Sequence, residues 1–161
     1  MAAPRFAVDK MLGRLATWLR LTGHDATYGS HLSRRTLIRE ARVDGRTILT
    51  RDHRLLRERN RPPLLFIEDD DFRAQLRQVV HAFDLDPFNR LFTRCARCNV
   101  PVVPISKAEA AKRVPPYVFT TQAYFVHCPR CQRIYWPATH YEHVRRELQA
   151  MGFKPPADAG L

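Results

Sequence analysis

The four cysteines of the chain fall into two CxxC pairs. The first pair is Cys95 and Cys98, the second is Cys128 and Cys131, and the sequence of 161 residues holds no other cysteine. Zinc prefers four soft ligands at tetrahedral corners, and each CxxC turn offers two sulfurs to one side of an ion. We therefore predict a structural zinc site with no open coordination position. The alternative is a pair of disulfides, which are rare in reducing compartments.

The composition is that of a folded protein. Hydrophobic residues make up 45% of the chain, which is enough to form a packed core. No apolar run approaches the roughly 20 residues of a membrane span, and the first residues do not resemble an export signal. These features lead us to expect a protein of the cytoplasm.

The chain is strongly basic in both halves. Its formal net charge is +11, and residues 1–90 carry 17 Lys and Arg against 12 Asp and Glu. Residues 91–161 carry 10 against 4. Most of these cations are arginines, whose planar guanidinium binds phosphate through two hydrogen bonds and stacks on bases. We interpret the excess as a nucleic-acid-binding surface. The alternative is a solvated basic surface with no dedicated partner.

Short apolar runs alternate with amphipathic stretches in the first half of the chain. Helical spacing of apolar residues, together with N-cap and glycine signals, predicts a helix after each apolar run. Such an order predicts a mainly parallel sheet with helices on both faces, so we expect an α/β domain over residues 1–90. The predicted strands lie near 6–8, 26–28, 47–50 and 64–67.

The alternation stops near residues 84–87, and a second module is expected beyond that point. We assign residues 91–153 to a zinc ribbon that ends in a helix over about 141–151. Between the two cysteine pairs, residues 107–112 are expected to form one or two helical turns. Residues 154–161 are expected to be a flexible tail.

Two aspartates directly follow predicted strands of the first domain. Asp9 follows the first strand and Asp52 follows the third. The carboxyl ends of parallel strands meet at one edge of a sheet, so we expect these catalytic candidates to lie at one edge. Two carboxylates suit Mg²⁺ or Mn²⁺, which can activate water for attack on a phosphodiester. The alternative role of each aspartate is that of a helix N-cap.

Basic side chains lie close in sequence to both aspartates. We expect some of these cations to hold the phosphates that flank the reacting one. The acidic run over 68–71 could supply a further metal ligand through Asp71, or it could favour the start of the following helix. The candidates for nucleic-acid binding are Lys10, Arg14, Arg20 and Arg51.

Four sequence segments together resemble the Mut7-C family. They are residues 6–25 (FAVDKMLGRLATWLRLTGHD), residues 45–52 (GRTILTRD), the pair Cys98 and Asn99, and residues 135–140 (YWPATH). The resemblance covers about residues 5–152 and implies a PIN-like nuclease fold joined to a zinc ribbon. It further implies a metal-dependent endoribonuclease in which Asp9 and Asp52 occupy the acidic positions of the family pattern.

One position departs from that pattern. The family usually places an acid at the start of the second helix, and Arg34 stands there in this chain. The leading hypothesis is a protein that cleaves RNA with a divalent metal. The alternative is a non-catalytic module associated with RNA or the ribosome, with tRNA and ribosomal RNA as the candidate partners. A third hypothesis treats the ribbon as a protein-docking element.

Overall fold

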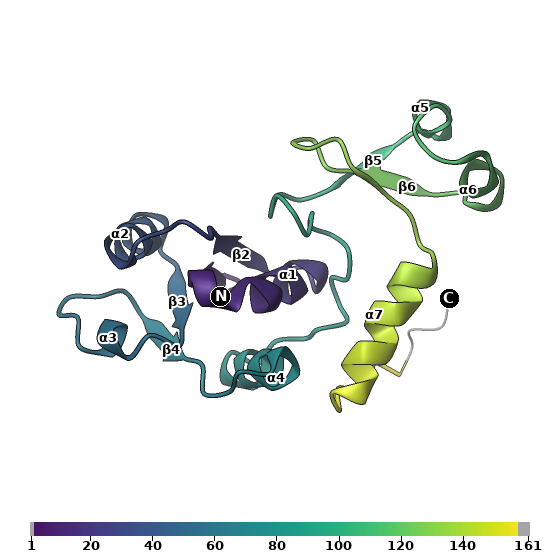
Figure 1. Ribbon diagram of the computed structural model, residues 1–161. Coiled ribbons are helices and arrows are strands. Elements are labelled where there is room, and N and C mark those ends of the chain that lie inside the picture. Colours follow the sequence, from purple (N-terminus) through teal and green to yellow (C-terminus); the bar gives the residue numbers. More distant parts are fainter. Residues whose placement is uncertain (1, 158–161) are drawn as a thin grey trace.

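The computed structural model describes residues 2–157 and contains two sheets in that part of the chain. The N-terminal sheet is parallel, has four strands and follows the order β2-β1-β3-β4. The second sheet is antiparallel, has three strands and follows the order β5-β6-β7 (Figure 1). The predicted α/β fold with a smaller cysteine-bearing module is confirmed.

The strands of the parallel sheet alternate with helices along the chain. The strands are β1 (Arg5–Val8), β2 (Asp25–Tyr28), β3 (Thr47–Thr50) and β4 (Leu64–Phe66). The helices are η1 (Lys10–Leu12), α1 (Gly13–Leu21), α2 (Arg34–Asp44), α3 (His53–Leu56) and α4 (Phe72–Ala82).

Helices cover both faces of the parallel sheet. Successive side chains of a strand point to opposite faces, so the central strands carry apolar residues on both faces. In β1, Phe6 and Val8 join the core formed with α1 and α4, whereas Ala7 joins the smaller core under α2 and α3. Figure 1 shows these two pairs of helices on opposite sides of the strands. This arrangement leaves the carboxyl ends of β1 and β3 free to carry polar side chains.

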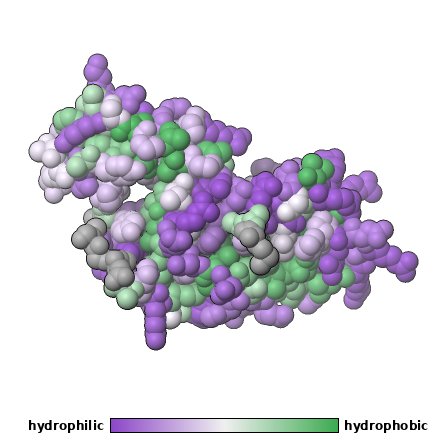
Figure 2. Space-filling view, turned by 180° about the vertical axis from the view of Figure 1, so that it is seen from behind, coloured by the Kyte–Doolittle hydropathy of each residue, from purple (hydrophilic) through white to green (hydrophobic). Residues whose placement is uncertain are grey.

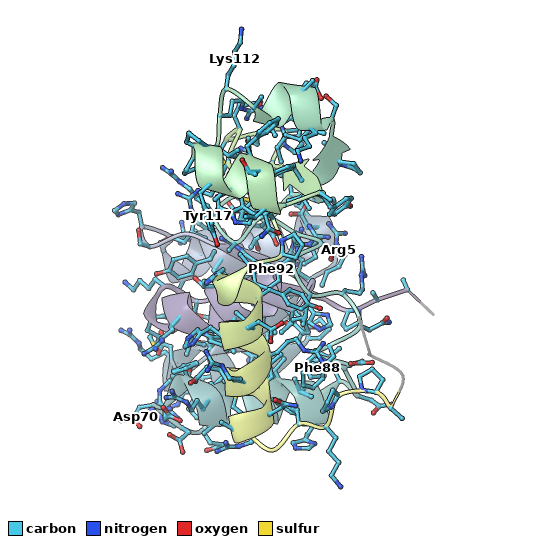
Figure 3. All side chains as sticks on the ribbon, turned by 90° about the vertical axis from the view of Figure 1, so that its right-hand side faces the viewer. Arg5, Asp70, Phe88, Phe92, Lys112 and Tyr117 are labelled. Carbon is cyan, nitrogen blue, oxygen red and sulfur yellow. The ribbon has the colours of Figure 1, made fainter. Side chains whose placement is uncertain are left out.

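The ribbon consists of the two cysteine turns, residues 103–135 and the following Trp136, and its core is small. It contains β5 (Val103–Ile105), α5 (Lys107–Ala110), α6 (Pro116–Thr121), β6 (Phe125–His127) and β7 (Ile134–Tyr135). Buried Ala110, Val114 and Phe125 pack with Trp136 at its centre. In Figure 3, Lys112 extends from the far end of this lobe. The predicted turn at 107–112 is present as α5. Helix α6 was not predicted; it is six residues long and buries none of them, so it has little signal in the sequence.

The last helix, α7 (Thr139–Ala150), returns from the ribbon to the N-terminal domain. Its buried Val144 and Leu148 belong to the same core as α1 and α4. Figure 3 shows α7 lying along the N-terminal domain, with Phe92 near its start. The helix therefore packs on the first domain, although it follows the ribbon in sequence.

A polar seam joins the first cysteine turn to the edge strand β2. The Asn99 side chain accepts from the Ala26 backbone N–H at 2.9 Å and donates to Asp25 at 2.8 Å. Arg46 donates to the same Asp25 carboxylate at 2.6 Å. Burial alone would raise the pKa of Asp25, but the hydrogen bonds from Arg46 and Asn99 lower it to about 2. The seam fixes the ribbon against the sheet through a charged, hydrogen-bonded centre.

The start of the segment that was expected to be a tail packs against the first domain. Lys154 and Pro156 line a pocket with Val80, and residues 158–161 lie outside the described residues. No helix among residues 2–157 is both long enough and apolar enough to cross a membrane.

Candidate active site and metal centre

Asp9 and Asp52 line the same cleft at the carboxyl edge of the parallel sheet. Strands β1 and β3 are paired in parallel, and one aspartate follows each of them. The cleft has a volume of about 250 Å³. Its other polar lining residues are Lys10, Ser33, Arg34 and Arg54. Two carboxylates that are far apart in sequence therefore face one solvent-accessible space.

The Thr50 hydroxyl connects the two aspartates. It donates to Asp9 Oδ2 at 2.6 Å and accepts from the Asp52 backbone N–H at 2.9 Å. The Lys10 backbone N–H donates to Asp9 Oδ1 at 2.7 Å, so both oxygens of Asp9 are oriented. Asp9 is 7% exposed and Thr50 is fully buried. This network holds the Asp9 carboxylate in one position at the base of the cleft.

Both aspartates also cap helices, which was the alternative role considered for each. Asp9 caps η1, and Asp52 caps α3 by accepting from the Arg54 backbone N–H at 3.0 Å. Each carboxylate oxygen has two lone pairs, so capping does not exhaust the capacity of either group. The two roles are therefore compatible. In the same way, Asp71 is the N-cap of α4.

Two arginines lie against the Asp52 carboxylate. Arg54 Nε donates to Oδ1 at 3.0 Å, and Arg34 Nε forms an ion pair with Oδ2 at 3.5 Å. The hydrogen bond from Arg54 is the main cause that lowers the pKa of Asp52, with a further contribution from the charge of Arg34. Asp52 is therefore ionised at neutral pH. The cation of Arg34 occupies the side of the cleft where the family resemblance implies an acid.

The donor set of the cleft fits a divalent ion held by two carboxylates. Mg²⁺ commonly binds through one or two carboxylates, and waters and substrate phosphates complete its shell. Asp9 and Asp52 would provide these oxygens, and Oδ2 of Asp52 would be accessible to the ion once Arg34 moves away from it. Among residues 2–157, the one group of three or more side chains placed to hold a metal is the cysteine cluster. A third carboxylate therefore does not complete the cleft.

The four cations predicted to bind nucleic acid are placed differently. Lys10 lines the cleft, whereas Arg14 stacks on the Phe72 ring, with 3.8 Å between its Cζ and the ring centroid. Arg51 donates to the Ile67 carbonyl oxygen at 3.3 Å. Arg20 is buried and donates to the carbonyl oxygens of β2 and the first cysteine turn, which is a structural use of its charge.

The sequence interpretation did not single out two residues of the cleft. Arg54 lies two residues after Asp52, a spacing that fits an N-cap interaction and could have been recognised. Thr50 is the last residue of a buried strand, where its hydroxyl gives no signal in the sequence pattern. Its role depends on the pairing of β1 with β3.

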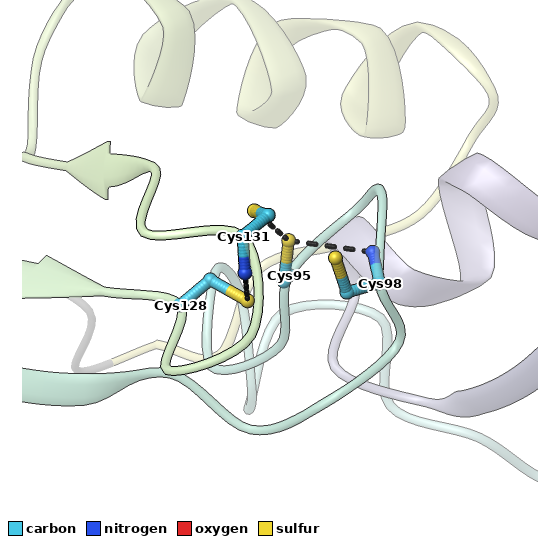
Figure 4. A group of neighbouring side chains, drawn as sticks. All are labelled: Cys95, Cys98, Cys128 and Cys131. Carbon is cyan, nitrogen blue, oxygen red and sulfur yellow. Dashed lines mark hydrogen bonds between the residues drawn. The ribbon is translucent and has the colours of Figure 1, made fainter.

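The four cysteines form one cluster that can hold a metal ion. Their sulfurs all lie within 4.8 Å of one another, and Cys95 Sγ is 3.8 Å from Cys131 Sγ (Figure 4). Zinc–sulfur bonds of about 2.3 Å at tetrahedral angles place sulfurs about 3.8 Å apart, whereas a disulfide needs about 2.05 Å. All four cysteines are free thiols, so the geometry fits zinc and contradicts the disulfide alternative.

The two cysteine turns have the same backbone geometry. In each, the N–H of the second cysteine donates to the sulfur of the first at 3.4 Å. The following residues, Asn99 and Gln132, both have a φ of 63°, and the N–H of each donates to the carbonyl of the first cysteine. Backbone N–H donors of this kind favour thiolate over thiol.

Tyr135 supports the thiolate of the first turn. Its hydroxyl lies 3.0 Å from Cys95 Sγ. Burial alone would raise the pKa of the Cys95 thiol, but the Tyr135 hydroxyl and two backbone N–H groups lower it to about 7. Burial and the neighbouring thiols raise the pKa of Cys98 to about 12. At neutral pH Cys98 is therefore a neutral thiol unless a metal ion is bound, and four thiolates can coexist in this cluster only beside a cation.

A comparison with protein families gives one match. The model of the Mut7-C RNAse domain matches residues 4–148, which is nearly the whole described chain. Searches of curated proteins and of solved structures give no match. The matched range includes the cleft and the cysteine cluster.

Proposed function

The chain belongs to the Mut7-C RNAse domain family, and from this premise we propose that it hydrolyses RNA phosphodiesters at the cleft of Asp9 and Asp52. The observation that carries the proposal is that both carboxylates line one cleft and are linked through the Thr50 hydroxyl. A divalent ion held by these two carboxylates would neutralise phosphate charge and lower the pKa of a bound water.

The residues of the cleft have two roles in this proposal, which are to orient the metal-binding carboxylate and to bind phosphates. Asp9 is held rigidly by Thr50 and the Lys10 backbone, so its carboxylate is oriented before substrate arrives. The side chains of Lys10 and Arg54 line the same cleft and carry charges that suit the phosphates on either side of the scissile one. Oriented groups of this kind reduce the reorganisation that is needed during reaction.

The second metal in the proposal is structural. We assign zinc to the four cysteines, because the sulfur cluster leaves no coordination position for water or substrate. In this account the zinc holds the two cysteine turns together, and the chemistry stays at the cleft. RNA is the ligand whether the protein cleaves it or only binds it, and experiment must identify the class of RNA.

The test is cleavage of a labelled single-stranded RNA by the zinc-loaded protein in Mn²⁺. Asp9→Asn removes a carboxylate charge without changing the size of the side chain, and we expect it to lower the cleavage rate at least about 100-fold. Asp84→Asn is the matched control, because Asp84 is exposed and its φ of 50° suits asparagine equally. Equal rates for the two variants would refute the assignment of the cleft.

A second candidate function is RNA binding without cleavage. It is favoured by the Arg34 guanidinium, which lies against Asp52 and opposes a metal ion there. In this case the wild type binds RNA and leaves it intact in Mn²⁺. Arg34→Glu removes the cation and supplies a third carboxylate. Cleavage by this variant would show that Arg34 blocks a competent cleft, whereas no cleavage would show that the cleft is inert.

A further inference from the structure

A second cavity lies along the edge strand β2, where the ribbon packs against the N-terminal domain. Its volume is about 570 Å³, more than twice that of the cleft. Five arginines line it against a single carboxylate, and we call it the arginine groove. The charged residues that line it are Arg20, Arg46, Arg94, Arg97, Arg130 and Asp25.

The two cysteine turns contribute one arginine each to this groove. Arg97 directly precedes Cys98, and Arg130 directly precedes Cys131. Because the two turns share one backbone geometry around a common cluster, equivalent positions of both turns reach the same cavity. Both side chains are exposed, and neither forms a hydrogen bond or ion pair with residues 2–157. Their guanidinium groups are therefore available to a ligand.

The other charges of the groove are held inside the protein. Arg46 pairs with Asp25, and Arg20 donates to backbone carbonyl groups. Arg94 donates to the Asn99 carbonyl oxygen, but its buried Nε has no partner in the described part of the chain. An unpaired buried N–H is costly, and it favours an anion that can approach it. The groove thus has a cationic floor held by internal hydrogen bonds and a rim of two exposed arginines.

Tyr28 joins the groove to the cleft. Its side chain lines the groove, and its hydroxyl donates to the Lys10 carbonyl oxygen at 2.8 Å. Lys10 in turn lines the cleft that contains Asp9. A chain of phosphates that leaves the cleft past Lys10 therefore meets the half-buried ring of Tyr28 and then the arginines. The upper lobe of the molecule in Figure 2 is the ribbon, which stands beside the larger N-terminal body.

We propose that the arginine groove binds the phosphate backbone of the RNA strand whose neighbouring segment occupies the cleft. Arg97 and Arg130 contact the phosphates, and the ring of Tyr28 offers a face on which a base can stack. This inference rests on the proposed function, since it takes the substrate to be RNA. It gives the ribbon a part in substrate binding, because the metal cluster sets the positions of both rim arginines.

The test compares two double variants of the full chain with zinc bound. Arg97→Gln/Arg130→Gln removes the rim charges, and Arg39→Gln/Arg146→Gln removes two exposed helical arginines that line neither cavity. Binding of a fluorescent single-stranded RNA is measured without added Mg²⁺ or Mn²⁺, so that cleavage does not interfere. Zinc content and thermal unfolding establish that both variants fold as the wild type does.

We expect the groove variant to lose at least about ten-fold in RNA affinity at low salt, and the control to lose less than about three-fold. The slope of log affinity against log salt should fall by about 0.7 for each lost phosphate contact on single-stranded RNA. Equal affinity and equal slope for the groove variant and the control would overturn the inference.

Failure of the inference can be separated from failure of the proposed function. If the wild type cleaves RNA and the groove variant binds it as well as the control does, the groove assignment is wrong and the cleft assignment stands. If the groove variant loses binding while the wild type does not cleave, the groove stands without catalysis. A wild type that does not bind RNA at low salt would refute both.

Discussion

Arg34 Nε lies 3.5 Å from Asp52 Oδ2, so a cation faces one of the two carboxylates of the cleft. The same guanidinium reaches Glu58 through a contact of 3.3 Å. A divalent ion at Asp52 therefore competes with an ion pair that the protein already makes. Arg34 is one-third exposed, which allows it to swing away at modest cost.

Replacement of this arginine should strengthen metal binding. In Arg34→Glu the cleft gains a third carboxylate and loses a cation, so we expect Mn²⁺ affinity to rise about ten-fold or more. Arg39→Glu is the matched control, since Arg39 is exposed on the same helix and does not line the cleft. Calorimetric titration of both zinc-loaded variants measures the difference. Equal Mn²⁺ affinities would show that Arg34 does not limit the site.

The seam around Asp25 should contribute substantially to stability. Asp25→Asn removes the closer and less exposed of the two carboxylates that pair with the buried Arg46, and we expect a loss of about 2–4 kcal/mol in the free energy of unfolding. Asp44→Asn removes a second partner of the same arginine, but this carboxylate is 46% exposed and should cost less than about 1 kcal/mol. Denaturant unfolding at neutral pH compares them. Similar losses would mean that the seam is not a stabilising centre.

His24 should make the fold sensitive to mild acid. Burial, with a further contribution from the nearby charge of Arg90, lowers its pKa to about 4. An unfolded histidine has a pKa of about 6.5, so the unfolded chain takes up a proton first and stability falls as the pH drops from about 6.5 towards 4.

For one such group the loss between pH 7 and pH 5 is about 2 kcal/mol. His24→Gln should therefore lose about 2 kcal/mol less than the wild type over this interval, as measured by thermal unfolding at both pH values. The zinc ligands titrate in both proteins, so their contribution cancels in the comparison. Equal losses of stability in the wild type and in His24→Gln would show that His24 does not cause the sensitivity to acid.

Removal of the cysteine-bound metal should affect more than the ribbon. Chelation or Cys95→Ser is expected to unfold the ribbon, whose own core contains few large side chains. Because Asn99 ties the first turn to β2, hydrogen exchange should also increase in residues 25–28, while β3 stays protected. Unchanged exchange in β2 would show that the seam does not depend on the metal.

The order of strands and helices in the first domain could be predicted because each has a local signal. The apolar run at 47–50 is bounded by polar residues, and Ser33 and Gly45 cap α2 as their types suggest. The CxxC spacing similarly predicted the cluster. These features depend on neighbours in sequence, which the pattern displays directly.

The contacts that shape the site could not be predicted in this way. Asn99 and Asp25 are 74 positions apart, and their hydrogen bond exists only because the ribbon packs beside the edge strand. Arg20 is one of the predicted nucleic-acid-binding cations, and the same packing buries it beside backbone carbonyl groups, which the sequence does not indicate. The ion pair of Arg34 with Asp52 likewise depends on the approach of α2 to α3. The sequence does not indicate whether a basic side chain faces solvent, a carbonyl oxygen or a carboxylate.

The single-turnover rate of RNA cleavage in Mn²⁺, measured for Asp9→Asn, Asp52→Asn and the double variant, tests the central claim most directly. If both carboxylates serve one site, each single variant should lose most of the activity and the double variant should lose little more. A wild type that binds RNA without cleaving it, or a double variant that cleaves at the wild-type rate, would contradict the account.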